Sequence, residues 1–323
     1  MQAQHFHSRT LPRVNRHRSS RGSAPRAAFT LVELLVVIAV VTILAGLITA
    51  AAFNATRTAR VASVKSEISN LEKAITDFKL RYGVDVPSFI RLHEDGSNWS
   101  NTDTETRRSR AIIQRIWPRF SFGADVDING DGDDTDVINL NGTECLVFFL
   151  GGVCNTYTSL GADAGTELVT GTVSNTGTPE GWIPLGFSAN PVNPFDRAGT
   201  TRVQPFIEFD NIRFIRTSSG MPGYRDPIPN QQTPYAYGSA VSSARGAGYQ
   251  AGDFATGTTS SLTTGYTKPS GEPHKPRSFQ IISPGYDFTF GTGGVYDGQS
   301  IIDPTRANER DNISNFSNGE FGG

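Results

Sequence analysis

Residues 29–53 read FTLVELLVVIAVVTILAGLITAAAF, an apolar run that contains one charged residue, Glu33. The 20 residues from Leu34 to Phe53 carry no charge. At a rise of 1.5 Å per residue, a helix of that length extends about 30 Å, which matches the hydrocarbon core of a bilayer. The run therefore predicts a transmembrane helix with one carboxylate close to its N-terminal end.

The segment before this run has the opposite composition. Residues 1–28 contain six arginines and no acidic residue, and they show no apolar periodicity. They predict a basic leader that is not part of the fold. Arginines on the N-terminal side of a span place that side in the cytoplasm, so we expect the rest of the chain to be exported.

Two simpler interpretations of the span are a cleaved secretory signal and a plain signal anchor. A secretory signal has an apolar region of about 7–15 residues, followed by small residues at its cleavage site. Here the run is longer, and the small residues Ala27 and Ala28 precede it. A signal anchor explains the span but leaves Glu33 unexplained, because a carboxylate inside a membrane is costly without a partner.

Residues 28–34, Ala-Phe-Thr-Leu-Val-Glu-Leu, resemble the processing motif of type IV prepilins and type II secretion pseudopilins. The resemblance implies that prepilin peptidase cleaves between Ala28 and Phe29 and that the new amino terminus is methylated. It also implies that Glu33 pairs with the terminal amine of a neighbouring subunit, which would give a buried carboxylate its ammonium partner. Ala28 departs from the usual Gly, and we expect cleavage to tolerate it because alanine is also small.

The helical pattern continues beyond the span. Apolar residues recur every three or four positions as far as Tyr82, and Gly83 follows as a C-cap, which predicts one apolar helical face. The stripe covers only three heptads, so we expect it to pack on a sheet of the same chain rather than in a coiled coil. Its members are Val61, Val64, Ile68, Leu71, Ile75, Phe78 and Tyr82.

The resemblance extends over residues 22–87 and implies an α+β fold. In this pilin-like lollipop, a long N-terminal transmembrane and stem helix packs on a small antiparallel β-sheet. Here the sheet domain would carry large loop-rich insertions, since residues 156–180 and 238–273 are rich in Gly, Ser and Thr. The predicted parts are a removed leader (1–28), a transmembrane helix half (29–53), an amphipathic stem half (54–83) and an exported domain (84–323).

Residues 102–117 predict a short amphipathic helix followed by Pro118. Its arginines are compatible with a nucleic-acid contact or with a solvated helix face. We favour the solvated face and expect no nucleic-acid partner, because the exported domain is otherwise acidic. These arginines are Arg107, Arg108, Arg110 and Arg115.

Residues 125–136, DVDINGDGDDTD, are the sharpest chemical feature of the exported domain. Their spacing fits the calcium loop of EF-hands, although Gly132 replaces an apolar residue and no helix precedes the loop. Alternating acidic residues around a glycine turn offer the hard oxygens that Ca²⁺ requires. We expect a stand-alone structural calcium loop, with a solvated acidic turn as the alternative. The candidate ligands are Asp125, Asp127, Asn129, Asp131, Asp133 and Asp136.

Residues 278–294 predict a strand followed by a glycine-punctuated loop. They resemble the C-terminal strand and loop of the major pseudopilin, which holds a structural calcium in that family. The resemblance implies Ser283 and Asp287 as part of a second, less complete calcium site, and a plain turn is the alternative. Phe288 stands where the family has Gly.

Cys145 and Cys154 are the only cysteines, and both lie in the part expected to be exported. An even number of cysteines in an oxidising compartment predicts a disulfide. Two buried free thiols are the alternative, because Cys145 falls in a short apolar helix that we predict over residues 141–151.

The charge balance and the absence of catalytic motifs limit the classes of function that the sequence supports. Residues 29–323 carry 23 basic and 31 acidic residues, a formal charge of −8, because the leader holds six of the 29 basic residues and no acid. One span and an acidic chain argue against a polytopic membrane protein and a basic nucleic-acid binder. Only His93 and His274 remain after the leader, and we find no hydrolase, metalloprotease or P-loop motif, so we expect no enzyme.

We therefore predict a structural subunit of a pilus-like filament, in first place a type II secretion pseudopilin. One span would hold it in the inner membrane with its exported domain in the periplasm. Its partners would be other pilin-like subunits, prepilin peptidase and the inner-membrane assembly platform. The alternative is a minor or tip subunit whose enlarged domain binds a secreted substrate, a surface or DNA.

Overall fold

The computed structural model describes residues 29–157, 181–301 and 303–322. The chain divides into two compact units, with the boundary between Asn54 and Ala55. Helix α1 (Leu31–Tyr82) contributes to both units. The predicted leader and most of the predicted loop 156–180 lie outside the described residues.

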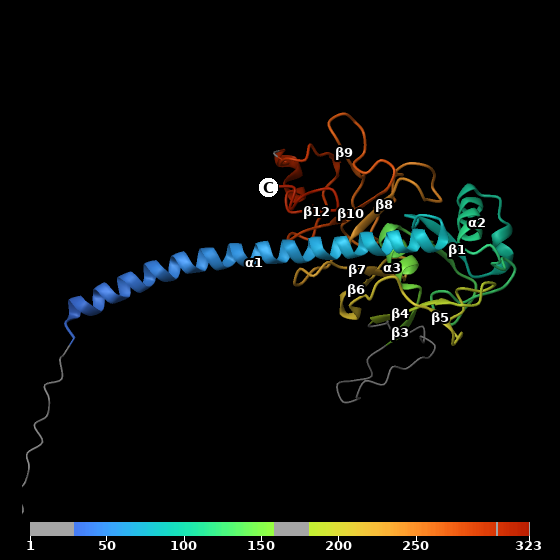
Figure 1. Cartoon of the computed structure of the whole chain (residues 1–323), viewed down its shortest axis with the longest axis horizontal. Coiled ribbons are helices and arrows are strands. Elements are labelled where there is room, and N and C mark those ends of the chain that lie inside the picture. Colours follow the sequence, from blue (N-terminus) through green and yellow to red (C-terminus); the bar gives the residue numbers. More distant parts are fainter. Residues whose placement is uncertain (1–28, 158–180, 302, 323) are drawn as a thin grey trace, which may run out of the picture. The chain divides into compact units, whose positions relative to one another are not determined.

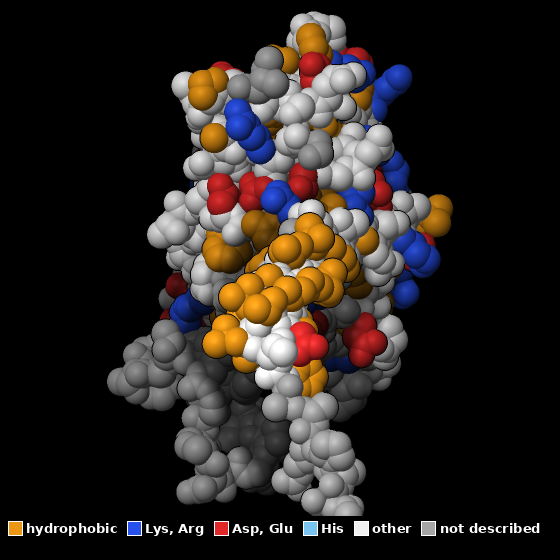
Figure 2. Space-filling model, turned by 90° about the vertical axis from the view of Figure 1, so that its left-hand side faces the viewer, with side chains coloured by type: hydrophobic (Ala, Val, Ile, Leu, Met, Phe, Trp, Pro, Cys, Tyr) orange, Lys and Arg blue, Asp and Glu red, His pale blue; other side chains and the backbone are white. Residues whose placement is uncertain are grey.

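The N-terminal part of α1, as far as Asn54, is apolar on every side. Its large side chains are exposed along the whole segment. Leu31 near its start is 80% exposed, and Phe53 near its end is 73% exposed. Figure 2 shows apolar side chains gathered over this segment. Among the described residues, α1 is the one helix long and apolar enough to cross a membrane. The helix predicted from residues 29–53 is therefore present.

The second unit, Ala55–Gly323, is called the head below. It holds the remainder of α1, two further α-helices and many short strands (Figure 1). The helices are α2 (Thr104–Ile116) and α3 (Gly142–Gly151), with 3₁₀ turns η1 (Gly96–Ser100), η2 (Asn211–Arg213) and η3 (Pro304–Glu309). The strands are β1 (Ile90–His93), β2 (Val137–Leu140), β3 (Val153–Tyr157), β4 (Gly181–Ser188), β5 (Arg202–Val203), β6 (Phe214–Arg216), β7 (Pro222–Tyr224), β8 (Ala236–Ser239), β9 (Tyr266–Thr267), β10 (Phe279–Ser283), β11 (Gly294–Val295) and β12 (Ile313–Ser314).

These strands confirm an α+β fold with antiparallel sheets, but they divide over several sheets rather than one. The antiparallel groups are β1–β2, β12–β10–β8, β3–β4–β5 and β6–β7, while β9 and β11 pair in parallel. Prolines inside and beside the strands limit their length, because proline cannot donate to a ladder. Pro184 lies within β4, and Pro222 begins β7.

The predicted apolar stripe is the part of α1 that packs into the head. Val64, Ile68, Leu71, Ile75 and Phe78 are each at most 1% exposed, and all belong to the main hydrophobic core. In Figure 1, strands β8, β10 and β12 run along one side of this segment and β6 and β7 along the other. The expectation of packing within the chain, rather than in a coiled coil, is confirmed.

Helix α3 lies at the centre of the main core. All ten of its residues are buried. Its N-cap Asn141 forms a capping box with Glu144, which satisfies backbone N–H groups that would otherwise be buried without partners. Phe149 contacts Phe78 of α1 edge-on, with ring centroids 5.7 Å apart. This apolar helix is core, as its sequence predicts.

Cys145 and Cys154 are free buried thiols, so the predicted disulfide is not formed in this structure. Cys145 lies in the first half of α3, and Cys154 lies in β3, which follows that helix. Cys145 Sγ donates to the backbone oxygen of Leu140 at 3.4 Å, and Cys154 Sγ donates to that of Gly152 at 3.8 Å. Burial raises the pKa of both thiols.

Candidate functional site

The first candidate site is the start of α1. Thr30 donates its backbone N–H and its hydroxyl to Glu33 Oε2, each at 2.9 Å, and Glu33 N–H donates to Thr30 Oγ1 at 3.2 Å. These reciprocal bonds form a capping box. They fix the Glu33 carboxylate one turn from Phe29, the residue that the processing motif places at the mature N-terminus.

The capping role of Glu33 was missed in the sequence, although the spacing Thr-x-x-Glu signals it. Phe29 is 82% exposed and precedes the helix. Ala28, on the other side of the predicted cleavage point, lies outside the described residues. The described chain therefore presents one carboxylate and one aromatic residue at the tip of an apolar helix.

The second candidate site is the acidic loop between α2 and β2, and the antiparallel pair of β1 and β2 holds its C-terminal end. The two strands pair antiparallel, with His93 opposite Val137. One residue further, Glu94 N–H donates to the backbone oxygen of Asp136 at 3.1 Å. The pairing therefore brings Glu94 against the end of the loop.

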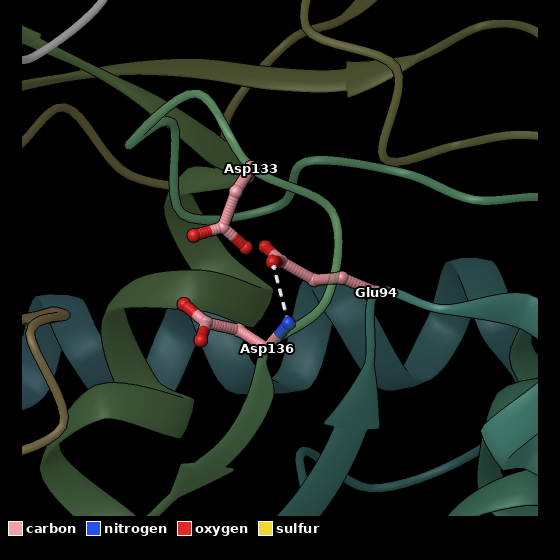
Figure 3. A group of neighbouring side chains, drawn as sticks. All are labelled: Glu94, Asp133 and Asp136. Carbon is pink, nitrogen blue, oxygen red and sulfur yellow. Dashed lines mark hydrogen bonds between the residues drawn. The ribbon is translucent and has the colours of Figure 1, made fainter.

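Glu94, Asp133 and Asp136 converge at this point (Figure 3). One carboxylate oxygen from each lies within 4.8 Å of the others. Glu94 is fully buried, Asp136 is half-buried and Asp133 is exposed. Three carboxylates at this separation repel one another unless a proton or a cation neutralises part of their charge.

The backbone holds the Glu94 carboxylate from two sides. Glu94 Oε1 accepts N–H groups of Ile128 and Asn129 at 2.6 and 3.1 Å, and Oε2 accepts the N–H of Asp136 at 3.3 Å. Burial still dominates and raises the pKa of Glu94 to about 7. Burial, followed by the charges of Asp131 and Asp133, raises the pKa of Asp136.

The structure thus brings together two of the six predicted ligands, Asp133 and Asp136. The other four have different partners. Asp125 accepts the N–H of Gly96, and Asp127 accepts the N–H of Gly130 and lies 3.7 Å from Arg197 Nη1. Asn129 donates its side-chain amide to Asp131 and Asp136 at 3.1 and 2.8 Å.

Glu94 itself was missed in the sequence. It precedes the loop by more than 30 residues, and no motif spacing links the two. The only signal for it is the register of β1 against β2, which a single sequence does not reveal. Glu94, Asp133 and Asp136 together offer the hard oxygens that suit Ca²⁺.

The C-terminal loop after β10 has a different organisation. Ser283 donates its hydroxyl to Asp226 at 2.6 Å, whereas Asp287 Oδ1 accepts the N–H and hydroxyl of Thr289. The two predicted ligands of the second calcium site are therefore engaged in separate hydrogen-bond groups. Phe288 adopts φ 63°, the left-handed conformation that suits the glycine expected there.

A buried ion pair organises the last part of this loop. Glu309 is fully buried and accepts the N–H groups of Thr292 and Gly293 at 3.1 and 3.2 Å. Arg306 donates to the same carboxylate, with Nη2 at 2.5 Å from Oε2. A guanidinium group thus neutralises the buried carboxylate in this loop.

Comparison with known proteins identifies the start of the chain. Residues 24–49 match the family model of the prokaryotic N-terminal methylation motif, which is the prepilin signature of type IV pilins and pseudopilins. No curated protein matches the chain, and no solved structure matches it. The matched residues include Phe29, Glu33 and most of the apolar run.

Proposed function

We propose that this chain is a structural subunit of a pilus-like filament and that the filament belongs to a type II secretion system. The prepilin signature is the premise of this proposal. The observation that carries the proposal is the tip of α1, where Phe29 directly precedes an apolar helix and the Glu33 carboxylate lies in its first turn. That arrangement suits an assembly in which helices pack side by side and each Glu33 meets a neighbour's terminal amine. A buried carboxylate is tolerable with such a partner and costly without one.

The finer choice of a secretion pseudopilin rests on the sequence of the C-terminal strand and loop, residues 278–294. On this proposal the span holds the precursor in the inner membrane with the head in the periplasm. Prepilin peptidase, the inner-membrane assembly platform and other pilin-like subunits would be its partners. The role is structural rather than catalytic.

Imaging distinguishes this function from its alternative. Fibres purified from cells that express an epitope-tagged full chain would be labelled with antibody and viewed by electron microscopy. Label along the whole fibre supports a major subunit, and label at one end supports a minor or tip subunit with a binding role for its large head. Fibres without label, in cells where the tagged chain is processed, would contradict the proposal.

We also propose that the acidic loop holds a structural Ca²⁺. The convergence of Glu94, Asp133 and Asp136 supports the ion, because it would remove the repulsion among three carboxylates that the fold brings together. Oxygens of water and backbone would complete the six to eight ligands that Ca²⁺ takes. The ion would join the end of β1 to the loop and so stabilise the head.

Calcium titration of the detergent-solubilised full chain tests this proposal. A ligand that binds only the folded state raises the melting temperature by linkage, and we expect such a rise at millimolar Ca²⁺. The double variant Glu94→Gln, Asp133→Asn should lose the rise. The control Asp287→Asn should keep it, since Asp287 lies in the C-terminal loop. No rise in the wild-type chain would leave the loop a solvated acidic turn.

A further inference from the structure

The exposed side of α2 carries an arginine face that the proposed function does not use. We define it as Arg107, Arg108, Arg110 and Arg115 of α2 together with Arg119, which follows the helix. All five residues are exposed, while Thr106, Ser109, Ile113 and Ile116 turn the opposite side of α2 into the head. The face therefore concentrates five positive charges in a chain whose mature form is acidic.

None of these five arginines forms an ion pair with any described residue. Arg108 donates to the backbone oxygen of Arg245, and Arg110 donates to that of Trp99 and lies 4.3 Å from the Phe122 ring centroid. The nearby acids are taken by a different cation: Asp103 and Glu105 both pair with Arg91. Like charges three or four residues apart on a helix destabilise it, and no acid in the described part of the head pairs with these arginines to offset that repulsion.

The complementary charges belong to the acidic loop. Asp133 and Asp134 are exposed and Asp131 is half-buried, and within the described residues none of the three pairs with a lysine or arginine. Asp134 is also outside the group formed by Glu94, Asp133 and Asp136. Its charge would therefore remain available even with Ca²⁺ bound.

The two charged surfaces both border η1, where Arg110 donates to Trp99 and Asp125 accepts the N–H of Gly96, yet among the described residues no ion pair joins them within one head. Arg108 of α2 contacts the segment that holds Arg245, whereas the loop lies under Arg197, whose guanidinium occupies the space above Gly130. One head therefore presents both surfaces at once. Complementary surfaces at two places on one subunit make heterologous contacts, which repeat from copy to copy and generate open helical filaments.

We infer that the arginine face of α2 docks the acidic loop of a second copy of this chain, with Arg115 and Arg119 facing Asp134 and its neighbours. The inference rests on the proposed filament function. The contact sets the register between neighbouring heads, since charge pairs at a solvated interface give specificity and association rate more than affinity. It also explains why α2 and the residues just after it, in an acidic chain, keep five arginines without ion pairs among the described residues.

Cross-linking between two singly substituted full-length chains tests the contact. Arg115→Cys in one chain and Asp134→Cys in another are co-expressed, and isolated filaments are treated with a short bis-maleimide. The native cysteines are buried, so they should stay silent. We expect a cross-linked heterodimer, and none when Ser270→Cys, an exposed position in the β9–β10 connection, replaces Arg115→Cys.

Charge reversal separates this contact from the filament proposal itself. Arg115→Glu alone should lower filament yield several-fold, and adding Asp134→Arg in the same chain should restore it. Filaments of the Arg115→Cys and Asp134→Cys chains that give no heterodimer, together with normal yield for Arg115→Glu, would overturn the docking while leaving the filament function intact. Arginine-dependent binding of the full chain to vesicles of anionic phospholipid, without cross-linking, would overturn it in favour of a lipid partner. Absence of any wild-type filament would instead count against the proposed function.

Discussion

Helix α1 has two parts with the same backbone and opposite surroundings. From Leu31 to Asn54 it is apolar around its whole circumference, and its side chains have no protein to cover them within the described chain. From Ala55 to Tyr82 a single apolar stripe is buried, and polar and charged residues occupy most of the remaining surface. The first part of the helix is thus apolar where the head does not cover it, and the second part is apolar only where it packs into the head.

The difference between the two parts of α1 shows that the spacing of apolar residues indicates what covers a helix. A stripe at a spacing of three and four residues tells where the protein itself covers a helix, as at Ile68 and Ile75. An apolar run without such a stripe indicates a helix covered by material outside the folded head, either lipid or neighbouring helices. The two parts should therefore respond to substitution in separate assays, the first in assembly and the second in head stability.

The largest expected effect is on assembly, at Glu33. Glu33→Ala and Glu33→Gln should both insert in the membrane and both fail to form filaments, because neither can pair with a neighbour's amine. Glutamine can still cap the helix, so it removes the charge and retains the capping box. Filament yield and membrane fractionation measure the two outcomes.

The control for Glu33 is Thr42→Ala, inside the same span. Thr42 donates its hydroxyl to the backbone oxygens of Ile38 and Ala39 in its own helix and is exposed in the described structure. This variant should assemble normally. Normal filaments from Glu33→Gln would show that capping, rather than charge pairing, is the role of this residue.

The next effect is on head stability, at Phe78. This side chain is fully buried between Phe149, Phe206 and Tyr82. Phe78→Ala should lower the free energy of unfolding of the head by about 3–5 kcal/mol, through lost burial and the cavity left behind. Thermal unfolding of the detergent-solubilised chain, followed by near-ultraviolet circular dichroism, measures it.

Leu44→Ala is the matched control for Phe78, because Leu44 lies on the same helix in the part that the head does not cover. Its substitution should leave the unfolding transition of the head unchanged. An equal loss of stability from both variants would show that the two parts of α1 are not independent.

A smaller effect is expected at Glu67, which fastens α1 to the head. Its carboxylate accepts both terminal nitrogens of Arg213 and the hydroxyls of Tyr224 and Tyr235. Glu67→Gln keeps the shape and removes the charge, and it should destabilise the head by about 2 kcal/mol, the usual size for lost hydrogen bonds to a charged group. Chemical denaturation at fixed ionic strength measures the loss. A change below that of the exposed pair described next would contradict this role.

The smallest effect is expected at Asp77, on the exposed side of the same helix. It pairs with Lys73 one turn earlier at 2.7 Å, and its side chain is 40% exposed. Exposed pairs of this kind contribute about 0.3–0.5 kcal/mol. Asp77→Asn should therefore change the denaturation midpoint barely beyond experimental error, and a larger shift would place Asp77 in an unrecognised contact.

Local patterns in the sequence predict the helices well. The predicted stem ends at Tyr82, as α1 does, and the helix predicted over residues 102–117 is α2, from Thr104 to Ile116. Caps and apolar spacing act over a few residues, so a single sequence contains them. The apolar character of α3 likewise predicts its place in the core.

Features that depend on pairing between distant segments cannot be predicted from this single sequence. Glu94 reaches the acidic loop only because β1 pairs with β2 in one register. The strands divide into several small sheets because loops and prolines separate them, and the sequence alone suggests one sheet. The disulfide prediction counted cysteines and compartment alone, and in this structure both thiols are free and buried.

The central claim is that α1 becomes the mature N-terminus of an assembling subunit. Intact-mass and peptide mass spectrometry of the native membrane protein tests it most directly. We predict a mature chain that begins at Phe29 and carries one methyl group on its terminal nitrogen. A membrane-inserted, filament-competent chain that still begins at Met1 would contradict it.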